Sequence, residues 1–157
     1  MNTTSADRRS ACDEAIEDLL NALGPSLLQY LDEAGAWTDL EHADAQATLD
    51  RLAVGQRASF EEVAGLVTRR HVLPELETYP SEFGSYHYLA LDFLMTRLIA
   101  NQIGVVAAAD AAIAACARTQ ALRIIERVRE REAECLAELR KLIDRLRESP
   151  VSRERRK

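Results

Sequence analysis

Polar side chains interrupt the apolar seam of two predicted helices, and their types could support chemistry. One seam reads Leu, Leu, Gln56, Ser59, Val, Leu at spacings of three and four. Another reads Ile, Val, Glu132, Cys135, Leu, Leu at the same spacings. Burying an unpaired charge costs several kcal/mol, so a carboxylate in mid-core calls for a reason. Carboxylate, amide and thiolate groups that face one another could bind a metal ion.

A small rotation of either helix gives a second interpretation of these residues. If Leu136 points inward, Glu132 lies at the flank of its helix and pairs with Arg129. If Phe60 points inward, Gln56 moves to the flank in the same way. Because the polar pair recurs at the same place in both helices, we favour the buried arrangement.

Asp92 is a further candidate, because its neighbours from Tyr88 to Met95 are apolar. A carboxylate in such surroundings needs a donor, for example Arg97. Asp92 would then be either a metal ligand or proton acceptor, or a buried hydrogen-bond partner that fixes the preceding loop.

Histidine offers little metal-binding capacity. The chain has three histidines, His42, His71 and His87, too few for a hemerythrin-type site. His71 lies in an acidic segment where imidazole and carboxylate could bind Zn or Fe. A solvated surface segment is the simpler interpretation, and His87 is expected to cap or pack the start of a helix.

Long helices must position the candidate residues. Apolar periodicity predicts a helix over residues 12–34, with Ser10 as its N-cap and a break at Gly24-Pro25. A second helix, over residues 38–68, begins with the capping box Thr-Asp-Leu-Glu.

Residues 71–84 contain Pro74 and Pro80 and are predicted to be extended. At ~3.3–3.6 Å per residue they span roughly 46–50 Å, about the length of the preceding helix. The chain can therefore cross the whole molecule here, which would make the helices before and after this segment parallel. A folded-back loop is the alternative.

The C-terminal half contains no Gly or Pro over residues 105–149. We expect a helix from about Ser85 that is apolar nearly all round and the most buried element, then a last helix over about 120–147. The turn between them falls in the Ala-rich residues 107–120. The alternative is one helix over residues 85–147 that pairs across a dimer.

Composition sets the class of protein. The chain has 157 residues, is 47% hydrophobic and 5% aromatic, and carries a net charge of −6. These values predict an all-α protein with one domain over residues 11–148, a disordered N-terminus (1–10) and a disordered basic tail (149–157). The acidic body argues against nucleic-acid binding. Three cysteines without a close pair, no signal peptide and no long apolar run predict a cytoplasmic protein without disulfides or a membrane span.

Residues 47–67 and 121–139 resemble helices 2 and 4 of the ferritin-like and rubrerythrin-like superfamily. The resemblance implies a ferritin-like four-helix bundle, a long crossover between helices 2 and 3, and Glu-x-x-His motifs that hold two irons. The motif positions here read Gln56-Arg-Ala-Ser and Glu132-Ala-Glu-Cys, so Glu132 alone matches a family ligand.

An altered or vestigial metal site would comprise Glu132, Asp92, Cys135 and Gln56. We expect that the chain has lost the di-iron centre, holds no cofactor, and acts as a binding or assembly protein. Its partner would be a second copy, forming a dimer, or another helical protein. The alternative is a metal-dependent oxidoreductase or iron-handling protein that uses Fe or Mn. If the site is empty, Glu132→Leu should be neutral or stabilising, because it replaces a costly buried carboxylate. A loss of stability above ~2 kcal/mol would instead mean that Glu132 has an obligatory partner, possibly a metal.

Overall fold

The computed structural model describes residues 3–34, 42–69, 76–88 and 91–148. Within these ranges the chain forms helices and no strand, so the all-α prediction is confirmed. In chain order the elements are α1 (Thr3–Leu23), α2 (Leu27–Ala34), α3 (Ala43–Thr68), the 3-10 helix η2 (Ser81–Tyr88), α4 (Leu91–Ala115) and α5 (Leu122–Glu148).

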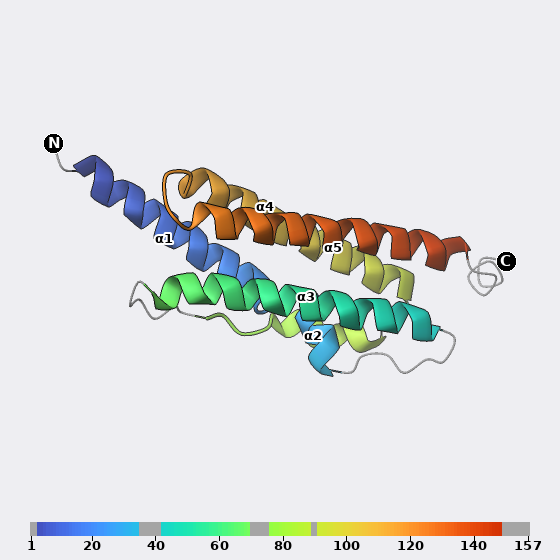
Figure 1. Cartoon of the computed structure of the whole chain (residues 1–157). Coiled ribbons are helices and arrows are strands. Elements are labelled where there is room, and N and C mark those ends of the chain that lie inside the picture. Colours follow the sequence, from blue (N-terminus) through green and yellow to red (C-terminus); the bar gives the residue numbers. More distant parts are fainter. Residues whose placement is uncertain (1–2, 35–41, 70–75, 89–90, 149–157) are drawn as a thin grey trace.

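The four long helices lie side by side around a common core (Figure 1). α1 packs against α3 and α4, and α5 packs against the same two helices, so α3 and α4 occupy one diagonal. Figure 1 shows that α3 and α4 run in the same direction, opposite to α1 and α5. This is the arrangement that the crossover prediction requires, because the chain must travel the length of α3 before α4 begins. Residues 71–75 of that segment lie outside the described residues.

The first predicted helix is split where the sequence predicts a break. α1 ends at Leu23 and α2 begins at Leu27, because Pro25 cannot supply a helical N–H and its ring obstructs the preceding turn. Gly24 also has a steric role. A Cβ at this position would lie 2.9 Å from Cε2 of Phe60, so only glycine admits the aromatic ring of α3 without a shift.

The start of α1 differs from the prediction. The helix begins at Thr3, and residues 3–10, expected to be disordered, belong to it. Ser10 is therefore inside the helix and not its N-cap. The physical reason is that residues 3–11 contain neither Gly nor Pro, so nothing local stops the helix there. The predicted capping box at residues 38–41 and the basic tail at 149–157 lie outside the described residues.

α4 and α5 are separate helices, so the single helix over residues 85–147 is wrong. The turn between them is closed by Thr119, whose backbone N and Oγ1 both donate to the carbonyl of Cys116, at 3.0 and 2.9 Å. The start of the third long helix was predicted too early, at Ser85. Residues 81–88 form η2, and α4 begins at Leu91.

α4 is less buried than predicted. Phe93 and Ile103 are each 45% exposed, because α4 packs on α1 and α5 with one side and leaves its other side uncovered. The part Phe93–Ala115 is also the one described helix that is long and apolar enough to cross a membrane, by length and composition alone. The core helix of a soluble protein passes the same test, so the prediction of no membrane partner stays a prediction.

A disulfide joins Cys12 of α1 to Cys116, just after α4. This corrects the expectation of three free thiols: residues far apart in sequence meet because α1 and α4 are neighbours. Cys135 is the free cysteine of the described chain. Since disulfides are rare in a reducing cytosol, the cysteine usage no longer supports the cytoplasmic prediction, which itself stays a prediction.

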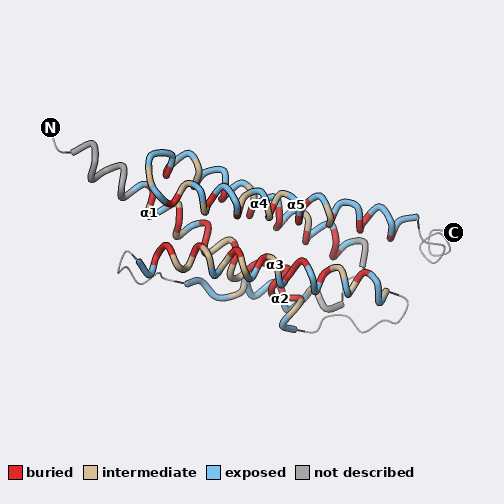
Figure 2. The backbone as a smooth tube through the Cα atoms, in the orientation of Figure 1, coloured by how far each residue is buried: buried red, intermediate tan, exposed pale blue. Residues whose placement is uncertain are grey.

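Figure 2 marks the buried residues in red, and the apolar ones among them form two clusters that make up the core. One surrounds α1, the second half of α3 and the α4–α5 turn, and includes Ile16, Val63 and Ile125. The other surrounds α2, η2 and the far end of α5, and includes Leu31 and Leu139. Buried polar side chains lie between the two clusters, and they form the site described next.

Candidate functional site

A connected set of buried polar side chains lies at the middle of the core. We call it the polar layer and define it as Ser26, Gln29, Gln56, Gln102 and Glu132. Each is at most 5% exposed, and each bonds to at least one other member. α2, α3, α4 and α5 all contribute, and Ser26 lies in the α1–α2 break. The layer therefore ties the core together across its full width.

Glu132 is the charged member, and two amides hold one of its oxygens. Oε2 accepts a hydrogen bond from Nε2 of Gln56 at 3.0 Å and from Nε2 of Gln102 at 2.9 Å. The side chain is 0% exposed, and its Oε1 has no hydrogen-bond partner among the described residues. The carboxylate thus has partners, but they are N–H donors on one oxygen.

The orientation of the two amides follows from their surroundings. Nε2 of Gln102 lies 3.0 Å from the backbone oxygen of Glu132 as well as 2.9 Å from Oε2. If the Gln102 amide were flipped, its oxygen would face the backbone oxygen and Oε2 of Glu132, which are both acceptors. Oε1 of Gln102 in turn accepts from Nε2 of Gln56 at 2.9 Å. Both N–H groups of each amide are therefore used, which satisfies buried donors that would otherwise cost about 1–3 kcal/mol each.

The α1–α2 break completes the layer from the opposite side. Ser26 donates from Oγ to Oε1 of Gln56 at 2.5 Å, and Gln29 donates to the same oxygen at 3.4 Å. Gln29 also donates to the backbone oxygen of Ala53 at 2.8 Å. Gln56 is therefore the hub of the layer, because its amide joins the break to α4 and α5.

Ser59 is buried one helical turn after Gln56 and contacts α5. Its hydroxyl accepts a hydrogen bond from Nη1 of Arg131 at 3.1 Å, and Nη2 of Arg131 pairs with Glu62 at 3.0 Å. The second predicted polar position of α3 thus faces an arginine of α5 and does not join the polar layer.

The structure separates the two interpretations of the seams. Gln56, Ser59, Glu132 and Cys135 are all buried, so the flank interpretation of Glu132 is wrong. Gln56 and Glu132 also meet directly, as their matching positions in the two helices suggested. Leu136 is buried next to Cys135, because this part of α5 packs on two neighbouring helices and buries a wider strip.

Ser26 and Gln29 were not predicted as members of the site. In an unbroken helix Gln29 would lie off the apolar stripe that contains Leu23, Leu27 and Leu31. The break at Gly24-Pro25 restarts the helix in a new orientation and turns Gln29 inward. The Gly24-Pro25 break is therefore the sequence feature that indicates a change in which residues of α2 point inward. Gln102 is a polar residue in the apolar sequence of α4, but an amide does not match a ligand type of the di-iron family.

Of the other candidates, Cys135 lies one helical turn after Glu132 and is 6% exposed. Burial, and then the nearby Glu132 carboxylate, raise the pKa of the Cys135 thiol to about 12. The thiol is therefore protonated at neutral pH and is a weak nucleophile and a weak metal ligand. Asp92 is the second residue of α4. Its side chain lies outside the described part of the chain, as do those of His71 and His87.

We expect Cys135 to resist alkylation in the folded protein. At pH 8 a thiol of pKa about 12 holds roughly a thousandfold less thiolate than an ordinary thiol of pKa 9.0. Iodoacetamide labelling followed by mass spectrometry should find Cys135 modified quickly in denaturant and hardly at all without it. Because the folded pKa is the higher one, the thiol's contribution to stability is intact below pH 9 and declines as the pH rises toward 12. Equal labelling rates in both states would contradict this picture.

The polar layer does not fit the di-iron centre that the resemblance implies. Such a centre needs about four carboxylates and two imidazoles, whereas the layer supplies one carboxylate, from Glu132. The amides of Gln56 and Gln102 aim N–H donors at that carboxylate, where a cation needs lone pairs. Among the described residues, no three His, Cys, Asp or Glu side chains come together as a metal-binding group. Comparisons with protein-family models, curated proteins and solved structures gave no match.

Proposed function

We propose that this protein is a ferritin-like helical bundle that works without a di-iron centre, as a binding or assembly protein. The observation that carries the proposal is the Glu132 carboxylate, which is engaged by the amides of Gln56 and Gln102 at the middle of the core. The parallel direction of α3 and α4 also supports it, because that arrangement follows from a long crossover (Figure 1).

In this proposal the polar layer has a structural task. Apolar side chains pack tolerably in several alignments, but a hydrogen-bonded amide is satisfied in only one. Buried polar groups are best attested as devices that fix the alignment of helices. The layer would thus hold the helices in one alignment, and the function would lie on the outer faces of the bundle.

The uncovered side of α4 is the surface that we assign to assembly. Most exposed residues on it are apolar or small, and they include Phe93, Ile103, Gly104, Ala107 and Ala111. Two charged residues are exposed there as well: Arg97, which lies over the Phe93 ring, and Asp110, which pairs with Arg129 of α5. Small residues let two helices approach closely, and the large ones provide apolar area to bury. We propose that α4 packs against α4 of a second copy and forms a dimer.

Replacing Ile103 with glutamate is expected to convert the dimer to a monomer, because two buried carboxylates would then face each other across the interface. Sedimentation velocity over a range of concentrations would measure the change. Val54→Glu is the matched control: Val54 is 63% exposed but lies on α3, away from the assigned face. A wild-type monomer at all concentrations, or insertion of the wild type into lipid vesicles, would contradict assembly through α4.

Metal content tests the other half of the proposal. Protein purified from cells supplied with Fe and Mn should carry well below one metal ion per chain, since two N–H donors occupy Oε2 of the one carboxylate in the polar layer. About one ion or more per chain, lost in Glu132→Gln, would favour the alternative: a metal-dependent oxidoreductase. Elemental analysis of both proteins decides between them.

A further inference from the structure

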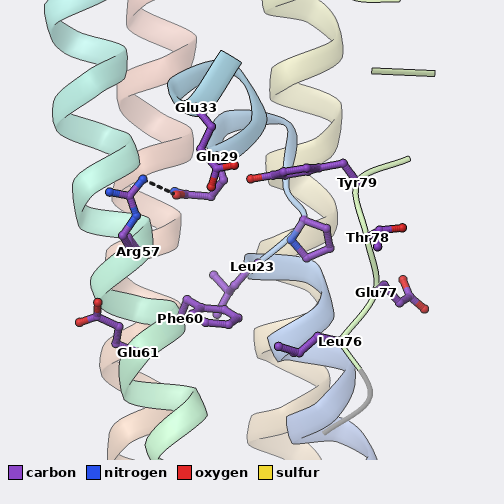
Figure 3. Close-up of a pocket in the computed structure, with 12 residues that line it drawn as sticks. Leu23, Gln29, Glu33, Arg57, Phe60, Glu61, Leu76, Glu77, Thr78 and Tyr79 are labelled. Carbon is purple, nitrogen blue, oxygen red and sulfur yellow. Dashed lines mark hydrogen bonds between the residues drawn. The ribbon is translucent and has the colours of Figure 1, made fainter. Parts of the chain in front are cut away.

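A cavity of about 520 Å³ opens at the α1–α2 break (Figure 3). Its walls are the break, one face of α3, and the segment 76–79 that precedes η2. The backbone N of Glu77 donates to Oδ1 of Asn21 at 3.1 Å, which holds this segment against α1. The volume lies within the range of roughly 300–1,000 Å³ that is usual for small-molecule sites.

The floor of the cavity is apolar. Leu23, Pro25 and Phe60 form it, and Figure 3 shows the side chains of Leu23 and Phe60 between α3 and the segment 76–79. Phe60 approaches the backbone of Gly24 so closely that a Cβ there would lie 2.9 Å from its ring. The ring therefore packs directly against the break, and an apolar ligand would find an apolar surface there.

The edge of the cavity has an excess of negative charge. Glu33, Glu61 and Glu77 line it, against a single cation, Arg57. Arg57 is already paired with Asp32 at 2.9 Å. By contrast, the side chains of Glu61 and Glu77 form no hydrogen bond or ion pair with any residue that the structure describes. Two carboxylates are thus available to a ligand, and the guanidinium is not.

Tyr79 adds an aromatic wall to the cavity. Its ring packs edge-on against Tyr30, with centroids 5.3 Å apart. Burial, followed by interaction with the Glu33 carboxylate, raises the pKa of Tyr79 to about 12. The phenol therefore stays neutral, and its ring keeps the negative face that attracts cations.

We propose that this cavity binds a small organic cation with an apolar or aromatic body. The body would leave water for the floor made by Leu23, Pro25 and Phe60, which is favourable in proportion to the apolar area buried. The ammonium group would remain at the edge, beside Glu61 on α3 or beside Glu77 on the facing segment, which Figure 3 shows on opposite sides of the cavity. An organic anion of the same shape would meet these carboxylates while Arg57 is held by Asp32. The proposal does not depend on the function of the polar layer.

Three ligands of one shape test the charge preference. Isothermal titration with 1-naphthylmethylammonium, 1-naphthylmethanol and 1-naphthoate presents the same rings with a positive, a neutral and a negative group. We expect the cation to bind at least tenfold more tightly than the alcohol, and the carboxylate to bind most weakly. Amide NMR signals that shift on titration should belong to residues 23–29, 57–61 and 76–79.

The double variant E61Q/E77Q should lower the affinity for the cation about fivefold and leave that for the alcohol unchanged. E126Q/E130Q is the matched control, because it removes two exposed carboxylates from α5, outside the cavity lining. Absence of binding by all three ligands, tightest binding of 1-naphthoate, or equal losses in the two double variants would overturn the proposal.

Discussion

Breaking the Cys12–Cys116 disulfide is expected to lower the free energy of unfolding by about 4–5 kcal/mol. The bond closes a loop with a sequence separation of 104, and chain-entropy estimates give about 4.7 kcal/mol for a loop of roughly 100 residues. The loss should be seen in urea unfolding of the reduced protein and of the variant C12A/C116A. Both should unfold at similar, lower urea concentrations than the oxidised wild type.

The control is Cys135→Ser, which keeps the disulfide and removes the free thiol. The oxidised and reduced forms of this variant should differ in free energy of unfolding by as much as the two forms of the wild type do. A wild type that unfolds at the same urea concentration with and without reductant would mean that the bond does not constrain the chain. Mass spectrometry under non-reducing conditions would establish which form is present.

Replacing Glu132 with leucine is expected to destabilise the fold by about 2–3 kcal/mol. The sequence predicts a neutral or stabilising effect if the site is empty, and a loss above ~2 kcal/mol if Glu132 has an obligatory partner. In the structure, Glu132 accepts from Gln56 and Gln102, so its loss leaves buried N–H donors unsatisfied, at about 1–3 kcal/mol each. Loss of the poorly satisfied Oε1 offsets part of that cost.

A triple variant separates this explanation from a simple packing defect. Replacing Gln56, Gln102 and Glu132 together with leucine removes the donors along with the acceptor. It should therefore recover at least half of the stability lost in Glu132→Leu, since apolar replacement of a whole buried polar group is often close to neutral. A triple variant that is less stable than Glu132→Leu would show that unsatisfied hydrogen bonds do not explain the instability of Glu132→Leu.

The sequence predicted the long helices well because their apolar periodicity is strong. The inward positions of α3 and α5, including Gln56 and Glu132, are all buried as predicted. Gly24-Pro25 predicted the break between α1 and α2, since these residues disrupt a helix through their own backbone chemistry. Local rules were sufficient wherever a local cause sets the structure.

The predictions failed where distant residues decide the outcome. The inward turn of Gln29 depends on the new orientation of α2, and the Cys12–Cys116 bond depends on which helices are neighbours. The apolar composition of α4 indicated deep burial, but nothing in one helix tells how many neighbours cover it. The partners of Glu132 were likewise invisible, because they come from two other helices.

The position of the disulfide makes the two halves of the molecule unequal. It fastens the apolar cluster that contains Cys12, Ile16 and Cys116, while the cluster around Leu31 and Leu139 has no such bond. The polar layer lies between the two clusters and separates their apolar side chains. Local opening should therefore begin in the cluster without the disulfide and stop at the polar layer. This would let α2 and η2 loosen while the crosslinked end keeps its shape.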